Sequence, residues 1–151
     1  MRALPAILLA LLAAPAAAQV RGQCVDGTSW WAEGRVAALG PCEAPEEAFL
    51  VLACDGGAIT AETPFPFGVA PDEPVSTTLD VDGRSFALEG RGTPYPATDV
   101  VGLGGAVLPE GAAEALAAGR QATLATAAGP VEIHLSGSGA AIAAMRAACG
   151  G

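Results

Sequence analysis

Few residues in this sequence have the types and spacing that catalysis requires. His134 is the only histidine, and alternation along residues 131–135 places it on the outer face of a strand, as a surface residue. A metal site would need more nitrogen or thiolate ligands. The serines of 136–139 do not form the Gly-x-Ser-x-Gly turn of a hydrolase, and such a turn before a helix is typical of a cap. We therefore expect no enzymatic activity, no cofactor and no metal site.

A repeated pattern marks candidates for binding. Residues 63–66 and 93–96 both read Thr-Pro-aromatic-Pro. The prolines restrict both stretches to extended, unpaired backbone, and rigid aromatic loops on a β-scaffold make good anchors for a partner. The alternative is that these rings only cover the end of the core. Strand alternation also buries one of two adjacent tryptophans and exposes the other. The candidate partner-binding residues are Phe65, Phe67, Tyr95 and Trp31.

Acidic residues are numerous, but no spacing holds a pair of them in a cleft, and we expect most of them to be solvated. The chain has 7 Lys+Arg against 16 Asp+Glu, a formal net charge of −9. A domain this acidic repels phosphate backbones, which argues against nucleic acid as a partner, and it is steered toward basic proteins or cationic ligands. The acidic residues considered are Glu43, Glu46, Glu47, Asp72, Glu73, Asp80 and Asp82.

Residues 1–18 have the features of a cleaved secretion signal. The positively charged start Met1-Arg2 precedes an apolar stretch over 6–14, and Ala16-Ala17-Ala18 forms a cleavage site of the Ala-x-Ala type. The apolar stretch is too short to span a bilayer of about 30 Å; a retained anchor is the alternative. We expect residues 19–151 to form a single mature β-rich domain without membrane insertion. The amino-acid composition is rich in Ala, Arg and Gly and has no lysine, which is typical of a bacterium with a high-GC genome. Together with the secretion signal, it predicts that the protein lies in the periplasm or outside the cell.

The four cysteines indicate two disulfides, since an even number in an exported chain is typical of a disulfide framework. Three pairings are possible. We favour Cys24–Cys42 with Cys54–Cys149, because Cys149 falls on the core-facing stripe of the last helix and Cys54 in a buried strand. The pairing Cys42–Cys54 with Cys24–Cys149 stays open.

The strongest local signal is a hairpin over Val75–Glu89. Apolar residues alternate with polar ones up to Val81, and Asp82-Gly83 suits a two-residue type I′ turn. That turn sets Leu79 opposite Phe86 and Thr77 opposite Leu88. Other strands are predicted over 29–36, broken by Gly34, and over 48–54, 58–62 and 100–107, with a second hairpin over 121–127 and 131–135.

Two short helices complete the predicted elements. Pro109–Ala118 has proline in its first turn and Gly119 to close it. The last helix runs over Gly139–Cys149, with Ser138 as N-cap and Gly150 at its end. The pattern thus predicts a mostly-β fold with sandwich-like antiparallel sheets, two short α-helices and disulfide staples.

The order of these features resembles that of a known group of proteins. The chain is similar to the small exported proteins of the invasion-associated locus B family and to related periplasmic accessory proteins of type VI secretion. The resemblance implies a small β-sandwich with a terminal helix and no known catalysis; the proline-rich stretch 63–74 is not part of it. The features that carry it are Trp30-Trp31, Cys42, the strand 50–54, Val81-Asp82-Gly83, Leu108-Pro109, 135–141 and Cys149-Gly150.

We therefore expect a non-enzymatic binding or accessory protein whose partner is a periplasmic or envelope protein, in support of an envelope or secretion assembly. The alternative is a small acidic inhibitor of a basic hydrolase such as a lysozyme, which rests on charge and size.

Overall fold

The structure is a computed structural model that describes residues 19–150, so the expected signal sequence over 1–18 lies outside the described residues. Within this range the chain forms ten strands and two helices. Their bounds are β1 Val20–Arg21, β2 Thr28–Glu33, β3 Val36–Pro41, β4 Leu50–Asp55, β5 Ala58–Thr63, β6 Pro74–Val81, β7 Arg84–Tyr95, β8 Val100–Val107, α1 Ala112–Ala118, β9 Gln121–Thr126, β10 Gly129–His134 and α2 Ser138–Cys149.

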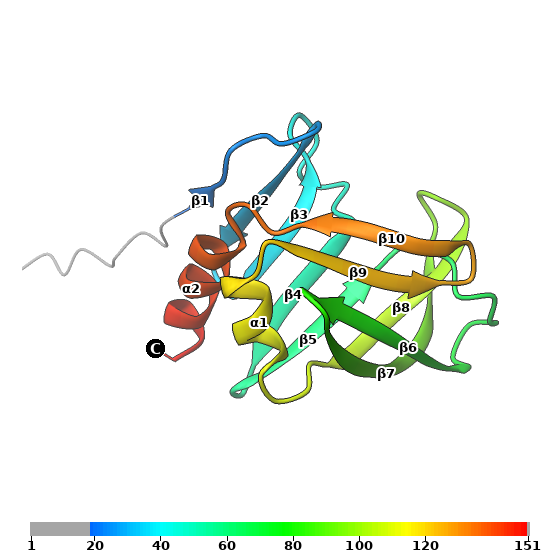
Figure 1. The fold of residues 1–151 in the computed structure, drawn as a ribbon. Coiled ribbons are helices and arrows are strands. Elements are labelled where there is room, and N and C mark those ends of the chain that lie inside the picture. The colour runs from blue at the N-terminus through cyan, green and yellow to red at the C-terminus, as the bar shows by residue number, and fades with distance from the viewer. Residues whose placement is uncertain (1–18, 151) are drawn as a thin grey trace, which may run out of the picture.

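The strands form one antiparallel sheet in the order β1-β2-β3-β4-β5-β8-β7-β6-β9-β10. The sheet coils, so that β6, β9 and β10 cross in front of β3, β4 and β5 (Figure 1). Leu52 of β4, Leu103 of β8 and Leu124 of β9 are buried in one hydrophobic cluster. The predicted mostly-β fold with two short helices is confirmed, and its sandwich-like halves belong to one continuous sheet.

The β6–β7 hairpin has the predicted register. Leu79 pairs with Phe86 and Thr77 with Leu88. At the Asp82-Gly83 turn the φ angles are 48° and 84°, the positive values that a type I′ turn requires. Local sequence therefore determines this hairpin.

Both disulfides have the favoured pairing, Cys24–Cys42 and Cys54–Cys149. The second joins the end of α2 to β4, and α2 packs on β2, β3 and β4. Ile142 and Met145 of α2 are fully buried, as the predicted core-facing stripe requires. No helix within residues 19–150 is long and apolar enough to cross a membrane.

The break expected at Gly34 is a full turn, so the strand predicted over 29–36 ends at Glu33 and the chain returns as β3. Gly34 has a φ of 53°, and β3 pairs with β2 on one side and β4 on the other. Alanine has a low strand propensity, which is why β3 was not predicted. Ala37 and Ala38 point to opposite faces and are both fully buried, so tertiary packing determines this strand.

Both helix starts also differ from prediction. α1 begins at Ala112 instead of Pro109, after Gly111 with a φ of 81°. Ser138 is not the N-cap of α2 but its first helical residue, and Gly137, with a φ of 92°, takes the cap position. In both cases a glycine in the left-handed region sets the entry of the chain into the helix.

Candidate functional site

The last strand, β10, is an edge of the sheet, since it pairs only with β9. At one end this edge lies against β2, where Nε1 of Trp30 donates a 2.8 Å hydrogen bond to the carbonyl of His134 and Nε2 of His134 lies 2.8 Å from Oγ1 of Thr28. Beyond the other end, the N–H of Ala127 donates a 3.0 Å bond to the carbonyl of Pro66. The hairpin is thus tethered at both ends, while the edge between them adjoins no strand of the described chain.

A groove of about 560 Å³ lies at this edge, and we call it the β10 groove. Its volume is in the range of ligand sites, roughly 300 to 1,000 Å³. The walls come from β10, the start of β9, the start of β2, β3, and the residues flanking β4 and β5. They are Asp26, Thr28, Leu39, Phe49, Phe65, Arg120, Gln121, Val131, Glu132 and His134.

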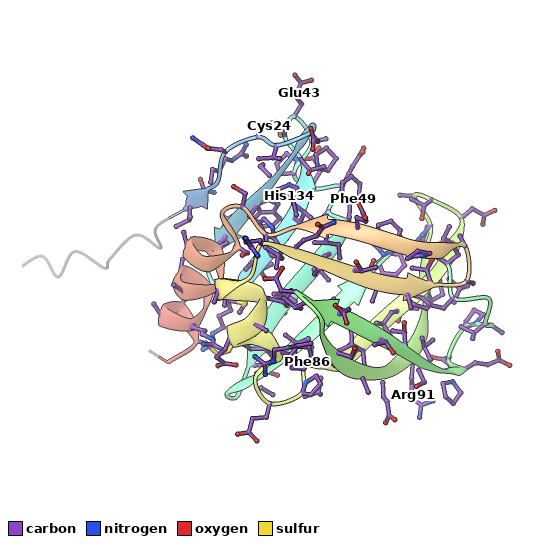
Figure 2. The ribbon with its side chains drawn as sticks, viewed as in Figure 1. Cys24, Glu43, Phe49, Phe86, Arg91 and His134 are labelled. Atoms are coloured by element: carbon purple, nitrogen blue, oxygen red, sulfur yellow. A yellow bond between two sulfur atoms is a disulfide. The ribbon has the colours of Figure 1, made fainter. Side chains whose placement is uncertain are left out.

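Two stacked phenylalanines form the main apolar surface of the β10 groove. The ring centres of Phe49 and Phe65 are 6.4 Å apart, with 25° between the ring planes, a separation typical of aromatic pairs. Both side chains are half-buried, so each ring packs on the fold and still presents a surface. The N–H of Phe49 donates a 2.7 Å bond to the carbonyl of Leu39. This bond fixes Phe49 beside β3, on the same side of the molecule as His134 (Figure 2).

Charged side chains surround this apolar surface. Asp26 and Glu132 supply two carboxylates, and Arg120 supplies one guanidinium. All three residues are exposed. The β10 groove is therefore amphipathic, with a small excess of negative charge that matches the sign of the whole chain.

Of the four candidate binding residues, Phe65 lines the β10 groove. Phe67 is half-buried and packs against the hydrophobic core. The hydroxyl of Tyr95 donates a 3.2 Å bond to the carbonyl of Leu103. Burial, and then the negative charge of Glu62, raise the pKa of Tyr95 to about 12. Phe67 and Tyr95 thus have partners within the fold.

The two Thr-Pro-aromatic-Pro stretches lie on either side of β8. Thr63, at the end of β5, pairs with Leu103, and Thr93 of β7 pairs with Gly102. A Cβ at Gly102 would collide with the carbonyl oxygen of Thr63 and lie 2.8 Å from the ring of Tyr95. This glycine therefore lets both stretches approach β8 closely.

The expectation of unpaired backbone is wrong for the second stretch, because Thr93, Pro94 and Tyr95 all belong to β7 and pair with β8. The pairing of β6 with β7 ends at Arg91. Beyond that point β7 is an edge on this side, and an edge strand accommodates proline because no N–H is needed there.

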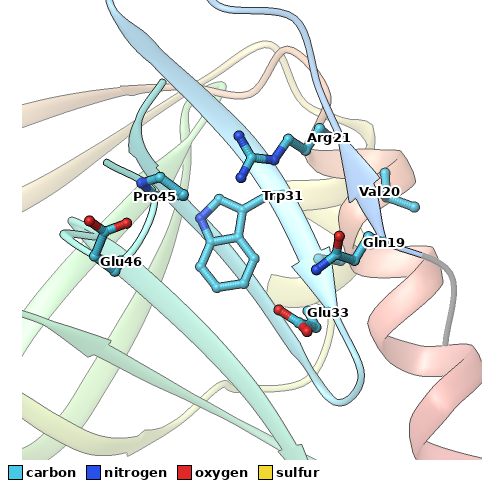
Figure 3. Close-up of a pocket in the computed structure, with 8 residues that line it drawn as sticks. Gln19, Val20, Arg21, Trp31, Glu33, Pro45 and Glu46 are labelled. Carbon is cyan, nitrogen blue, oxygen red and sulfur yellow. The ribbon is translucent and has the colours of Figure 1, made fainter. Parts of the chain in front are cut away.

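Trp31 lies in a separate pocket of about 190 Å³ (Figure 3). Trp30 is fully buried and Trp31 half-buried, in line with the predicted alternation. Nε1 of Trp31 is covered and has no hydrogen-bond partner among the described residues. The other residues that line this pocket are Gln19, Val20, Arg21, Ala32, Glu33, Pro45 and Glu46, and none of them lines the β10 groove.

His134 is half-buried between β10 and β2, so the prediction of an open surface residue is wrong. The reason is the coiling of the sheet, which brings the last strand against β2. Oγ1 of Thr28 lies 3.1 Å from the carbonyl oxygen of Val25 and 2.8 Å from Nε2 of His134, within hydrogen-bond distance of both. Nδ1 of His134 is buried without a partner among residues 19–150.

The serine next to the last helix has no arrangement for nucleophilic catalysis. The hydroxyl of Ser138 is buried and lies 2.7 Å from the carbonyl oxygens of both Leu116 and Leu135, to which it donates its proton. It therefore joins α2 to α1 and to the end of β10. Within the described part of the chain, no group of three or more His, Cys, Asp or Glu residues could hold a metal ion.

Phe49 lines the groove, but sequence reasoning did not identify it as a binding residue. The sequence pattern assigned it to a strand over 48–54. β4 begins one residue later, at Leu50, and Phe49 ends the loop before it. The acidic residues Glu46 and Glu47 just before it are typical of a loop, and they are the signal that could have separated Phe49 from the strand. Its contact with Phe65 depends on the strand order, which local patterns do not contain.

Comparison with protein families, with curated proteins and with solved structures finds no match for this chain. A functional interpretation therefore starts from the β10 groove and from the charge of the chain.

Proposed function

We propose that this chain is an exported, non-enzymatic binding protein whose β10 groove receives part of a partner protein. The observation that carries the proposal is the stacked pair Phe49 and Phe65, half-buried at the edge of the sheet. Aromatic side chains that are already held by the fold lose little entropy on binding, and they are enriched among the residues that dominate protein interfaces.

Two features support an exported location. Disulfides persist in oxidising compartments and are rare in the cytosol, and this chain has two, with no free cysteine among the described residues. Residues 1–18 have the composition of a secretion signal. Together with the resemblance to the invasion-associated locus B family, these features favour a periplasmic accessory protein of an envelope or secretion assembly.

Charge supports a protein partner with a basic surface. The formal net charge is −9, which repels nucleic acid and anionic lipid and increases the rate of encounter with positive surfaces. The β10 groove also has an excess of carboxylates. The charge of the whole chain, which guides the encounter, and the charge of the groove, which contacts the bound partner, therefore both favour a basic protein.

A second candidate function is inhibition of a basic hydrolase such as a lysozyme. The loop between β3 and β4 favours it, because Glu43, Glu46 and Glu47 are all exposed there. The Cys24–Cys42 disulfide anchors the start of this loop. An acidic loop beside an amphipathic groove suits a basic enzyme cleft, where it would compete with substrate.

The test is capture of partners from periplasmic and envelope extracts with the tagged protein, at low and high salt. The variant is Phe65→Ala, and the matched control is Phe67→Ala, in the same loop but outside the groove. We expect a specific partner that wild type and Phe67→Ala retain and Phe65→Ala loses. A partner that all three retain equally, or no partner at either salt, contradicts the proposal. A captured hydrolase that loses activity on binding would favour the inhibitor.

A further inference from the structure

We propose that the β10 groove binds its partner by strand addition, in which an extended basic segment of the partner pairs with the free edge of β10. This inference rests on the proposed function and names the kind of segment that the groove takes. In strand addition the main-chain hydrogen bonds supply affinity, and pockets for alternate side chains supply specificity.

Two hydrogen bonds at the C-terminal end of β10 show which of its backbone groups are free. The N–H of Leu135 donates to the carbonyl of Arg120, toward β9, whereas the carbonyl of His134 accepts from Trp30, away from β9. Backbone groups of successive residues alternate in direction along an antiparallel strand. The N–H and C=O of Glu132 therefore point away from β9, as do the C=O of Pro130 and the N–H of His134.

The lining of the groove shows that it follows this edge. Side chains of neighbouring residues in a strand point to opposite faces. Val131 and Glu132 are neighbours in β10, and both line the groove. A cavity that touches side chains from both faces of a strand lies along the edge of that strand, where the free backbone groups are.

The residues that line the groove determine what the added segment should contain. Leu39 and Phe49 supply apolar surface for apolar side chains, and the carboxylates of Asp26 and Glu132 supply negative charge for basic ones. Arg120 lies at the closed end, beside the tether between His134 and Thr28. A segment with alternating apolar and basic residues therefore complements the groove.

A second copy of this chain fits the edge less well. Two copies each carry a formal net charge of −9, and pairing of two β10 edges brings the carboxylates of Glu132 toward each other. Pro130 also lacks an N–H for a ladder. Charge and proline are the features by which edge strands avoid pairing with copies of themselves.

The test uses an eight-residue peptide of alternating lysine and valine with blocked ends, titrated into the disulfide-bonded protein. We expect the amide of Glu132 to become protected from hydrogen exchange on binding. Glu132→Pro removes this N–H without removing a bond to β9, and should weaken binding by about tenfold. The matched control Glu132→Gln keeps the N–H and removes the charge, and should weaken binding by only about threefold.

Peptide chemistry gives a second measurement that does not depend on the folding of a variant. N-methylation of the lysines and N-methylation of the valines remove opposite sets of N–H groups, so one peptide should lose binding and the other should keep it. Equal effects of Glu132→Pro and Glu132→Gln, equal effects of the two methylated peptides, or no binding at millimolar peptide would overturn strand addition. Dimers of the protein that Glu132→Pro dissociates would overturn it too, because the edge would then bind a second copy.

Failure of this inference can be told apart from failure of the proposed function. If Phe65→Ala loses the captured partner and Glu132→Pro retains it, the groove binds a protein but not by strand addition. If both variants retain the partner, both proposals fail.

Discussion

Nε1 of Trp30 lies 2.8 Å from the carbonyl oxygen of His134 and donates a hydrogen bond to it. The two residues are 104 positions apart in sequence, and the bond joins β2, near the start of the sheet, to β10, its last strand. It therefore holds the coiled sheet closed at one end of the β10 groove. Trp30 is fully buried and the bond is partly buried, so loss of this donor would leave a partly buried carbonyl without its partner, which is costly.

Replacement of Trp30 by phenylalanine should destabilise the protein by about 2 to 4 kcal/mol, because it removes this donor and leaves a small cavity. Trp31→Phe is the matched control, since Nε1 of Trp31 has no partner to lose within residues 19–150; it should cost less than about 1 kcal/mol. Urea denaturation of the two variants measures the difference. Equal losses of stability would show that the bond to His134 contributes little.

The two disulfides should differ in their contributions to stability. Cys54 and Cys149 are 95 residues apart, and Cys24 and Cys42 are 18 apart. In the loop-entropy model these separations correspond to about 4.7 and about 3 kcal/mol. Paired Cys→Ala variants, compared by urea denaturation with the protein in its oxidised form, should rank in this order. A melting temperature that does not change under reductant would contradict both contributions.

Local chemistry was sufficient to predict the β6–β7 hairpin and the two disulfides. The Asp82-Gly83 turn depends on the φ preferences of two adjacent residues, and its register follows from the turn. The pairing of Cys54 with Cys149 followed from one helical stripe and one buried strand. Each prediction depends on a short segment whose pattern carries the required information.

The β10 groove could not be predicted in the same way. It brings together Phe49, Phe65 and β10, which come from three distant segments, and their contact depends on the coiling of the sheet. The same coiling partly buries His134, which alternation alone placed on the surface. β3 was missed for a related reason, since tertiary packing rather than strand propensity holds Ala37 and Ala38 in place.

Gly102→Ala should destabilise the protein by about 1 to 3 kcal/mol, because the new Cβ meets the backbone carbonyl of Thr63, which cannot rotate away. Gly104→Ala is the comparison, since its Cβ meets the side chain of Thr93. Thr93→Ala should recover stability in the Gly104→Ala background and none in the Gly102→Ala background. Denaturation of the single and double variants gives the coupling energies. Equal rescue in both backgrounds would show that the collision at Gly102 is not with the backbone.

The same substitution should also affect the groove. Gly102 adjoins Pro64, next to Phe65, so a displaced backbone at Thr63 moves the aromatic pair. Gly102→Ala should therefore weaken capture of the partner. Gly105→Ala strains the backbone, because Gly105 has a φ of 63°, but its Cβ position has nothing within 4 Å, so it should destabilise the protein and leave capture unchanged. Loss of capture in both variants would indicate a general effect of stability.

The last prediction concerns the only tyrosine of the chain. Burial, and then the charge of Glu62, raise the pKa of Tyr95 from 10.0 to about 12, so the folded protein favours the protonated phenol. This contribution to stability is complete below pH 10 and is lost as the pH rises from 10 to about 12. Ultraviolet absorbance should show ionisation near pH 12 in the folded protein and near pH 10 after denaturation.

Two variants separate the causes of this shift. Glu62→Gln should lower the pKa of Tyr95 only in part, because burial is the larger cause. Tyr95→Phe removes the ionising group, so its stability should fall less than that of wild type over the same pH range. A folded-state titration near pH 10 would show that the phenol is open to water. Its bond to the carbonyl of Leu103 would then not hold the end of β7 against β8 in solution.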